Sequence, residues 1–427
     1  MNFISIEEAL KKKSGEVAIR GWIHRIRKMK DKIFIVMRDS SDIVQCVFKT
    51  PKLVEDADEL LRESSLELKG ILHKDERAPG GYELEITNMK IIHQSEDFPI
   101  GRDQSPEFLL DQRHLYIRSR KMTAIMKIRS TITGAIHEYF RSKDFYEFQS
   151  PIMVQGGAED GPTMFEIKYA HDRKMFLAQT WQLYAEAAMF GLEKLYCIAP
   201  SFRAEKSKTS RHLTEFWHAE MEAAWCNLDQ LMDYAEEMIK FILKKVIKEN
   251  KKELKILGRD IEKLKPSIDK KFPRITYDEA LEILGKKGRK IKWGKDLRTI
   301  EEERLMDSYD TIVFVTHYPK EVMAFYKPKD PKNPKVALCF DALGPEGVGE
   351  LIGGSERDTN IEELTKSLKE SGEKIEDYNY YLDTRKYGSI PHAGFGLGTE
   401  RLVRWICGLE SVKDAIGFPR TLQRTIP

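Results

Sequence analysis

Three glycines at every second position near the end of the chain limit its possible folds more than any other feature. They lie in the stretch PHAGFGLGTERLV, residues 391–403. Side chains alternate between the two faces of a strand, so in a strand these glycines would leave one face bare for a flat ligand. The three glycines are Gly394, Gly396 and Gly398. Close packing of a helix on the strand is the alternative explanation. The spacing matches neither the dinucleotide fingerprint nor a P-loop, so it predicts another kind of site.

The residues that follow the glycines have helical spacing. The segment TERLVRWICGL would begin with Thr399 as its N-cap, which places Arg401 in the first turn, near the positive end of the helix dipole. A guanidinium group beside a bare sheet face suits a purine ring and its phosphates. We therefore expect a nucleotide to bind here.

Length and composition indicate a soluble protein with more than one domain. A single core rarely grows beyond roughly 250–300 residues, and this chain has 427. Hydrophobic residues make up 41% and charged residues 33%, which supports a substantial core. The net charge is only +2, so any nucleic-acid surface must be local.

The cysteines and the apolar segments bear on the compartment. The five cysteines lie far apart, without C-x-x-C pairs or metal-ligand spacing, so we expect reduced, mostly buried thiols. The N-terminal segment has no apolar run of signal length, and no stretch is apolar enough to cross a membrane. We expect a cytoplasmic protein that does not enter membranes.

Residues 1–95 predict a small β-barrel. Five short β-branched runs lie between about residues 16 and 92, and the helical stretch LVEDADELLRES falls between the third and the fourth. This order is typical of an oligonucleotide-binding (OB) barrel. Residues 96–112 contain Pro99, Gly101 and Pro106 and indicate a linker.

Residues 113–427 predict a second domain, which makes the whole chain α+β. A long helix covers KMTAIMKIRSTITGAIHEYFRSKDF, and YEFQSPIMV after it is extended. Strands and helices then alternate without the rhythm of a doubly wound sheet, which favours a mainly antiparallel sheet flanked by helices. The lysine-rich segment 245–300 is interpreted as a solvated helical insertion.

A predicted antiparallel hairpin in CIAPSFRAEKSKTSRHLTEFWHAEMEAAW brings charged side chains together. In its first strand Arg203 and Glu205 share a face. One face of its second strand is apolar and should meet a core, with Trp217, Ala219, Met221 and Ala223. The other face carries Phe216, His218, Glu220 and Glu222, and the loop carries Lys206, Lys208, Arg211 and His212. Carboxylates buried together repel one another, so we expect them to meet ammonium or amide donors or Mg²⁺.

The segment CFDALGPEGVGELIGGSERD offers carboxylates for a metal ion. Asp341 and Glu350 are hard oxygen donors on either side of a glycine-rich turn, as a Mg²⁺-nucleotide site requires. Strict alternation puts Glu350 and Arg357 on opposite faces of a strand. Both can face one pocket only if a bulge occurs at Gly353 and Gly354.

The first strands of the barrel predict a surface for single-stranded RNA. Their basic residues are Arg20, Arg25, Arg27, Lys28, Lys30 and Lys32. Basic groups follow the phosphates while an exposed ring, such as that of Phe34, stacks on an unpaired base. A barrel of this size also needs an aromatic core, to which we assign Trp22.

Together these motifs resemble the three motifs of class II aminoacyl-tRNA synthetases. The resemblance rests on YEFQSPIM after a long helix, on FRAE followed by RHLTEFWHAEMEAAW, and on GFGLGTERL. With HKDERAPGG in an N-terminal OB barrel and GFPRTLQRTIP at the end, it covers nearly the whole chain. It points to the aspartyl, asparaginyl and lysyl subgroup, and within it to the archaeal type of asparaginyl enzyme.

The choice within the subgroup depends on the amino-acid pocket. Aspartyl enzymes typically carry a lysine after the run Q-S-P-Q-L-(Y/F), where it meets the substrate carboxylate, and this chain has Ala185 there. Glu220, where aspartyl enzymes have aspartate, would accept from the substrate amide, and Arg357 would donate to the amide oxygen. With aspartate bound, the negative charge of Glu220 would be left unpaired, and the pocket would therefore reject aspartate. The chain also departs from the family pattern at Asp160, Thr180 and Trp181.

The resemblance implies an ATP- and Mg²⁺-dependent ligase that attaches asparagine to tRNA(Asn) through asparaginyl-adenylate. Arg203, Arg401 and Glu350 would be the catalytic residues, with Arg203 on the α-phosphate and the substrate carboxylate. ATP would be bound by Arg203, Glu205, Arg211, His212, Phe216, Glu350 and Arg401, with adenine between Phe216 and Arg401. The amino acid would meet Glu159, Gln182, Glu220 and Arg357, the anticodon Arg27, Phe34 and Gln45, and Mg²⁺ Asp341 and Glu350. Pro151 and the preceding helix would lie in a homodimer interface.

Three other functions remain open. An aspartyl-tRNA synthetase, including one that charges both tRNA(Asp) and tRNA(Asn), would be favoured by a lysine at position 185. An asparagine-forming ligase related to the synthetases would lack the anticodon barrel, which this chain keeps. A non-catalytic RNA-binding scaffold would have lost motif residues, whereas Arg203, Glu350 and Arg401 are all present.

Overall fold

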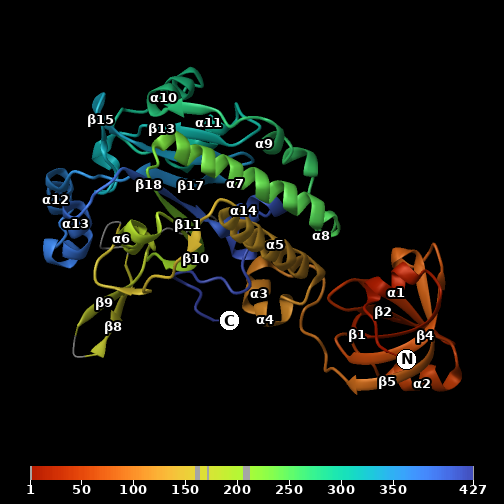
Figure 1. The fold of residues 1–427 in the computed structure, drawn as a ribbon. Coiled ribbons are helices and arrows are strands. Elements are labelled where there is room, and N and C mark those ends of the chain that lie inside the picture. The colour runs from red at the N-terminus through yellow and green to blue at the C-terminus, as the bar shows by residue number, and fades with distance from the viewer. Residues whose placement is uncertain (1, 159–163, 171–172, 205–211, 427) are drawn as a thin grey trace. The chain divides into compact units, whose positions relative to one another are not determined.

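The computed structural model describes residues 2–158, 164–170, 173–204 and 212–426 (Figure 1). The chain divides into two compact units, residues 1–112 and 113–427. Glu159, Glu205 and Arg211, together with Asp160, Lys206 and Lys208, lie outside the described residues.

The first unit is a closed barrel of five strands in the order β1-β2-β3-β5-β4. The predicted OB arrangement is confirmed, including the helix between the third and the fourth strand. The core consists mainly of aliphatic side chains such as Ile19, Ile35 and Leu68, together with the ring of Phe48, each fully buried. The elements are α1 (Ile6–Lys12), β1 (Gly15–Lys28), β2 (Ile33–Arg38), β3 (Ile43–Phe48), α2 (Pro51–Asp58), β4 (Ser65–Lys74), β5 (Tyr82–His93) and α3 (Pro106–Asp111).

Trp22 does not belong to the barrel core, so that prediction is wrong. Its side chain is 43% exposed, and the guanidinium carbon of Arg38 lies 5.2 Å from the ring centroid. The next residue, Ile23, is fully buried, so alternation along β1 turns Trp22 outward. Aliphatic residues and the ring of Phe48 fill the interior without it.

The second unit is built on an eight-stranded sheet in the order β12-β13-β16-β17-β18-β11-β10-β6. Its strands are antiparallel neighbours except for the pairs β12–β13 and β10–β6. The α+β prediction is therefore confirmed. The strands are β6 (Tyr146–Glu147), β10 (Lys194–Phe202), β11 (Glu215–Ala224), β12 (Arg274–Thr276), β13 (Val313–Thr316), β16 (Cys339–Gly344), β17 (Gly349–Glu356) and β18 (His392–Gly398).

Three helices cover one face of this sheet. α5, α7 and α14 lie over β11, β17 and β18 (Figure 1) and pack their apolar sides on them. The fully buried rings of Phe140 and Trp405 belong to this core. The opposite face is covered at its two edges, by α6 over β10 and by α10 and α11 over β13 and β16. The middle strands of that face are left for a site.

The helices of the second unit are α4 (Arg113–Tyr116), α5 (Arg120–Ser142), α6 (Gln182–Leu192), α7 (Leu228–Glu249), α8 (Lys251–Leu257), α9 (Pro266–Asp269), α10 (Tyr277–Lys286), α11 (Thr299–Met306), α12 (Ile361–Glu370), α13 (Asn379–Lys386) and α14 (Thr399–Cys407). Two small sheets accompany the large one. Their strands are β7 (Met153–Val154), β8 (Glu166–Lys168) and β9 (Lys174–Leu177) in one, and β14 (Lys329–Asp330) and β15 (Asn333–Ala337) in the other.

The lysine-rich segment 245–300 is more than solvated helix. It contains β12, an edge strand of the large sheet. Leu254, Leu264, Phe272 and Tyr277 within it are buried and join the cores on both faces of that sheet. The lysines lie on the outside of a segment that is built into the fold.

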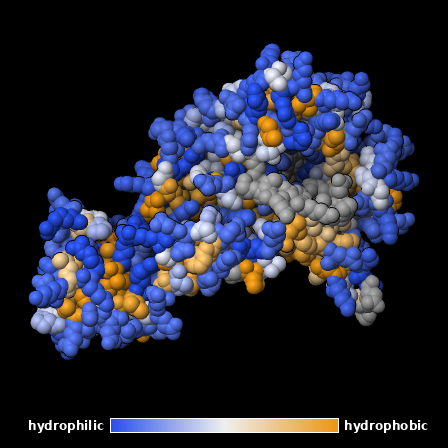
Figure 2. Space-filling view, turned by 180° about the vertical axis from the view of Figure 1, so that it is seen from behind, coloured by the Kyte–Doolittle hydropathy of each residue, from blue (hydrophilic) through white to orange (hydrophobic). Residues whose placement is uncertain are grey.

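The cysteines and the surface bear on what the composition predicted. All five cysteines are free and buried, as predicted. On the face drawn in Figure 2, hydrophilic residues dominate and hydrophobic ones form separate patches. No described helix is long and apolar enough to cross a membrane.

Candidate active site

The β10–β11 hairpin forms one wall of the site. Its strands pair antiparallel from Lys194 opposite Ala223 to Phe202 opposite Glu215, which confirms the predicted hairpin. Alternation along β11 sends Ala219, Met221 and Ala223 into the core, as predicted, whereas Trp217 is partly exposed. The other face of β11 carries Phe216, His218, Glu220 and Glu222 toward the open side of the sheet.

The glycines of β18 make room for side chains of β11. β18 lies between β11 and β17, and a Cβ atom on Gly394 would lie 2.2 Å from the carboxyl group of Glu222. A Cβ atom on Gly396 would lie 2.4 Å from the His218 ring. A bare glycine face was expected, but side chains of the neighbouring strand β11 partly occupy this face. Both strands point these residues to the same side of the sheet.

Helix α14 starts one position earlier than predicted, since Thr399 was expected to be its N-cap. Gly398 is its N-cap, and Thr399 is the first helical residue, with a buried hydroxyl group that bonds no described residue. Glu400 fastens the helix to the sheet, because its carboxylate accepts from the Trp217 N–H at 3.0 Å and pairs with Arg129 at 2.8 Å. Arg401 therefore still lies in the first turn, directed at the site.

A cavity of about 220 Å³ lies above β18 and the start of α14. Arg203, His212, Phe216, Glu350 and Arg401 line it, as do Gly396 and Gly398. The guanidinium carbon of Arg203 is 5.4 Å from the Phe216 ring centroid. Arg401 Nη1 donates to the Glu350 backbone oxygen at 2.7 Å and to its carboxylate at 3.2 Å. An aromatic face and two guanidinium groups border this space.

A second cavity of about 120 Å³ adjoins the first and shares Arg203, His218, Glu350 and Gly396 with it. Its other polar residues are Thr180, Gln182, Glu220, Tyr326, Lys327, Asp341 and Arg357. Residues predicted from three separate motifs thus line one pair of connected spaces: Arg203, Phe216, Glu220, Glu350, Arg357 and Arg401.

A bulge does bring Glu350 and Arg357 to one side, but not at the predicted place. Gly353 and Gly354 are in regular register with β16 and β18. The shift occurs where Ala342 pairs with Ile352 and Leu343 with Glu350, so Leu351 is the extra residue. Leu351 and Ile352 are both buried in the core, and this apolar burial is why the strand loses its alternation there.

Asp341 and Glu350 converge above Gly353. A Cβ atom there would lie 2.9 Å from Glu350 Oε1 and 3.7 Å from Asp341 Oδ1. Burial and the neighbouring Glu350 raise the pKa of Asp341 well above its usual value. Burial also raises the pKa of Glu350, but Arg401 and Arg203 outweigh it and lower that pKa.

These two carboxylates suit a divalent cation that keeps other ligands. No cluster of three or more His, Cys, Asp or Glu side chains suited to a metal occurs among the described residues. Mg²⁺ usually takes one or two protein carboxylates and completes its shell with water and substrate phosphates. The donor set fits that pattern.

The amino-acid side of the second cavity is held by hydrogen bonds. Glu220 is buried and accepts from the Trp181 N–H at 2.9 Å and from the Thr180 hydroxyl. Gln182 donates from Nε2 to Glu186 at 2.9 Å. Trp181 and Ala185 pack into a separate apolar cluster. The departure at Thr180 therefore serves to hold Glu220, whereas Trp181 contributes only its backbone N–H there and its indole Nε1 donates to the Phe148 backbone oxygen at 2.7 Å.

Arg357 is paired with a residue that the sequence did not assign to it. Its Nε lies 3.2 Å from both carboxylate oxygens of Glu222, its Nη2 also donates to Glu222, and its Nη1 donates to the Ser355 hydroxyl at 2.8 Å. Burial raises the pKa of Glu222 to about 8, although Arg357 opposes the rise.

Other residues of the second cavity also escaped sequence reasoning. Lys327 lies near Asp341 and Glu350; burial lowers its pKa, but Cys339, Tyr326 and these two carboxylates raise it above the usual value. Tyr326 has the Arg357 guanidinium carbon 5.1 Å from its ring centroid. Neither stands in a recognisable local pattern, so only the fold could reveal them.

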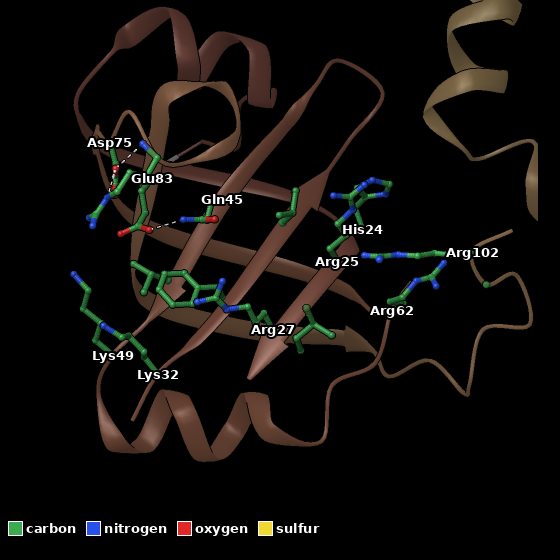
Figure 3. Close-up of a pocket in the computed structure, with 16 residues that line it drawn as sticks. His24, Arg25, Arg27, Lys32, Gln45, Lys49, Arg62, Asp75, Glu83 and Arg102 are labelled. Atoms are coloured by element: carbon green, nitrogen blue, oxygen red, sulfur yellow. Dashed lines mark hydrogen bonds and ion pairs between the residues drawn. The ribbon is translucent and has the colours of Figure 1, made fainter. Parts of the chain in front are cut away.

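The barrel carries its own groove of about 1150 Å³ (Figure 3). The three predicted anticodon residues, Arg27, Phe34 and Gln45, line it together with His24. The Arg27 guanidinium carbon is 5.5 Å from the Phe34 ring centroid, and Gln45 donates to Glu83 at 2.8 Å. Seven cationic side chains and two carboxylates border the groove: Arg25, Arg27, Lys32, Lys49, Arg62, Arg77 and Arg102, with Asp75 and Glu83.

Two protein-family models match the chain. One, described as tRNA synthetases class II (D, K and N), matches residues 105–422. The other, described as an OB-fold nucleic acid binding domain, matches residues 17–92. The fold and these matches define the class: a class II tRNA synthetase with an OB-fold unit.

Individual relatives narrow the class. The asparagine–tRNA ligase of Thermoplasma acidophilum is 45% identical and that of Thermococcus kodakarensis 46%, over 97% and 96% of both chains. The crystal structure of asparaginyl-tRNA synthetase from Pyrococcus horikoshii with asparaginyl-adenylate matches with a TM-score of 0.96 and 43% identity over the full length of both chains. The chain belongs to the asparagine–tRNA ligase family of class II tRNA synthetases.

The close approach at Gly394 predicts a sharp cost of one methyl group. Gly394→Ala would place a carbon 2.2 Å from Glu222 and 2.4 Å from the Met221 backbone oxygen, so we expect a loss of about 1–3 kcal/mol of stability, seen as a lower thermal midpoint. Gly134→Ala is the matched control, because Gly134 lies in α5 with nothing near its Cβ position. It should raise stability by about 0.4–1 kcal/mol. Equal midpoints for the two variants would contradict this packing.

Proposed function

We propose that the protein charges tRNA(Asn) with asparagine in two steps. A carboxylate oxygen of asparagine attacks the α-phosphorus of ATP, pyrophosphate leaves, and asparaginyl-adenylate forms. A terminal ribose hydroxyl of the tRNA then attacks the carbonyl carbon, and AMP leaves. The observation that carries the proposal is the pair of adjoining cavities that share Arg203 and Glu350. The relatives support it, because they are named asparagine–tRNA ligases and one was solved with asparaginyl-adenylate.

Catalysis in this proposal is positioning and charge stabilisation. Two anions must meet, and no side chain acts as a nucleophile. Arg203 borders both cavities, so it contacts the α-phosphate and the substrate carboxylate together. Phe216 and Arg401 hold adenine in the larger cavity, and His212 lies near the outer phosphates. The same assignment gives Glu205 and Arg211 to ATP and Glu159 to the amino acid.

Asp341 and Glu350 are the proposed Mg²⁺ ligands. Bound Mg²⁺ would neutralise phosphate charge during the displacement. Asp341 and Glu350 converge above Gly353, which has no side chain to fill that space. Arg401 holds Glu350 in place by donating to the backbone oxygen and to the carboxylate of Glu350.

The smaller cavity suits an amide side chain. Glu220, held by Thr180 and Trp181, accepts from the amide NH₂, and Arg357 donates to the amide oxygen. Gln182 contacts the ammonium group. Ala185 is fully buried among apolar residues, so no cation stands there to attract a second carboxylate. These features favour activation of asparagine. Activation of aspartate, as in an aspartyl-tRNA synthetase, is the alternative function.

The tRNA and a second copy of the chain complete the proposal. The cationic barrel groove binds the anticodon, with Phe34 stacked on a base and Gln45 at a base edge. β6 is an edge strand, and Tyr146, Ile152 and Met153 around Pro151 are exposed, which supports a homodimer interface there. We place the activity in the cytoplasm.

Amino-acid-dependent exchange of pyrophosphate into ATP tests the function. We expect exchange with asparagine and little with aspartate, and we expect Arg203→Ala to reduce it at least about 100-fold, because the charge that joins the two cavities is lost. Arg20→Ala, in the barrel unit, should leave exchange unchanged. Exchange with aspartate alone would overturn the assignment in favour of an aspartyl enzyme.

Phe34→Ala tests the anticodon groove. Loss of one base–ring stack costs about 1–3 kcal/mol, so kcat/KM for tRNA(Asn) should fall about 5- to 150-fold while pyrophosphate exchange stays normal. Trp22→Ala is the matched control, since Trp22 is an exposed ring of the same barrel that does not line the groove. If both variants charge tRNA like the original protein, the groove is not the anticodon site.

Asp341→Asn tests the metal site. One carboxylate ligand is lost, so the Mg²⁺ concentration for half-maximal exchange should rise roughly tenfold, and excess Mg²⁺ should restore part of the rate. Asp383→Asn removes a half-exposed carboxylate on α13 and should not change the Mg²⁺ requirement. An unchanged Mg²⁺ requirement in Asp341→Asn would contradict the assignment.

A further inference from the structure

Glu186, on α6, is a fully buried carboxylate behind the smaller cavity, and no step above uses it. Its Oε1 accepts from Gln182 Nε2 at 2.9 Å and lies 3.8 Å from Arg357 Nε. Its Oε2 accepts from the Tyr381 hydroxyl at 2.8 Å and from Arg385. One oxygen therefore faces two residues of the cavity wall, and the other is anchored to α13.

The surroundings of Glu186 keep it negatively charged. His392 Nε2 lies 3.1 Å from Glu186 Oε2, and Nδ1 lies 2.7 Å from the Ile390 backbone oxygen. Both ring nitrogens of His392 thus face oxygen atoms. Burial raises the pKa of Glu186, but Arg385, His392 and Arg357 together hold it below its usual range.

An ionised Glu186 decides which way the Gln182 amide points. A carboxylate can only accept, so Gln182 turns its NH₂ group toward Glu186. The amide oxygen is then directed away from Glu186, on a side chain that lines the cavity. An acceptor oxygen is what an ammonium group of a substrate needs.

Glu186 also limits the positive charge of the cavity wall. Arg357 and Arg385 are the two guanidinium cations here, with the His392 ring beside them, and Glu186 and Glu222 are the two carboxylates among them. Because burial raises the pKa of Glu222, Glu186 carries the firmer of the two negative charges. Without it, Arg357 would face the cavity with its charge less balanced and would attract a carboxylate more strongly.

We propose that Glu186 is a positioning residue that sets the amide preference of the smaller cavity. It directs the Gln182 oxygen toward the substrate ammonium group, and it balances Arg357 so that the cavity favours a neutral amide over a second carboxylate. This inference rests on the proposed function, because it concerns the same amino acid.

The test is Glu186→Gln, which keeps the size of the side chain and removes its charge. A hydrogen bond to a charged group is worth about 1.5–3 kcal/mol, so we expect KM for asparagine in pyrophosphate exchange to rise about 10- to 150-fold. kcat should change by less than about threefold, because the residues on the reacting phosphate are untouched. The ratio of kcat/KM for asparagine to that for aspartate should fall about tenfold or more, and Glu186→Asp should recover part of it.

A matched control separates this role from a structural one. Glu301 is also a buried carboxylate that accepts from arginines, Arg289 and Arg298, but it lies on α11 and lines neither cavity. Glu301→Gln should lower the thermal midpoint and leave KM and the asparagine-to-aspartate ratio unchanged.

The outcomes are distinct. If Glu186→Gln folds and keeps both KM and the ratio, the inference is wrong, whereas absence of asparagine-dependent exchange in the unaltered protein would refute the proposed function instead. If Glu186→Gln does not fold, Tyr381→Phe replaces it, since it removes one donor to Glu186 and no charge. That variant should raise KM for asparagine about two- to tenfold, and an unchanged KM would overturn the inference.

Discussion

Burying several carboxylates side by side is the constraint on which the synthetase unit depends. An ionised carboxylate removed from water is stable only with a cation or hydrogen-bond donors beside it, and removing the partner of such a pair is expensive. Four acidic side chains here have one: Glu186 has Arg385, Glu222 has Arg357, Glu220 has Thr180 and Trp181, and Glu350 has Arg401. The same pairs hold the arginines at the cavity walls in fixed directions, so stability and substrate geometry have one physical origin.

The strands bring these groups together through two local features of the backbone. Glycine at positions 394 and 396 of β18 leaves space for Glu222 and His218 of β11. The bulge at Leu351 lets β17 present Glu350 and, further along, Arg357 to the same side. Neither feature adds a chemical group to the site. Together they allow side chains from distant parts of the sequence to border the same two cavities.

Sequence patterns predicted the parts of this structure that depend on local periodicity. The five barrel strands, the β10–β11 hairpin and the β18 strand are all marked by alternation and turn residues. Features set by tertiary packing were not predicted correctly. The bulge lies at Leu351 because two apolar neighbours are buried, and Trp22 is outside because aliphatic residues and the ring of Phe48 fill the barrel. Glu186 and Arg385 are 199 positions apart, and no local pattern marks such a pair.

The central claim is that the two cavities hold the two halves of one reacting complex. Inhibition by a non-hydrolysable asparaginyl-adenylate analogue, measured in pyrophosphate exchange against each substrate in turn, tests it most directly. If the analogue spans both cavities, it will compete with ATP and with asparagine, and its affinity will exceed that of either substrate. Competition with only one of the two, and non-competitive inhibition against the other, would contradict the account.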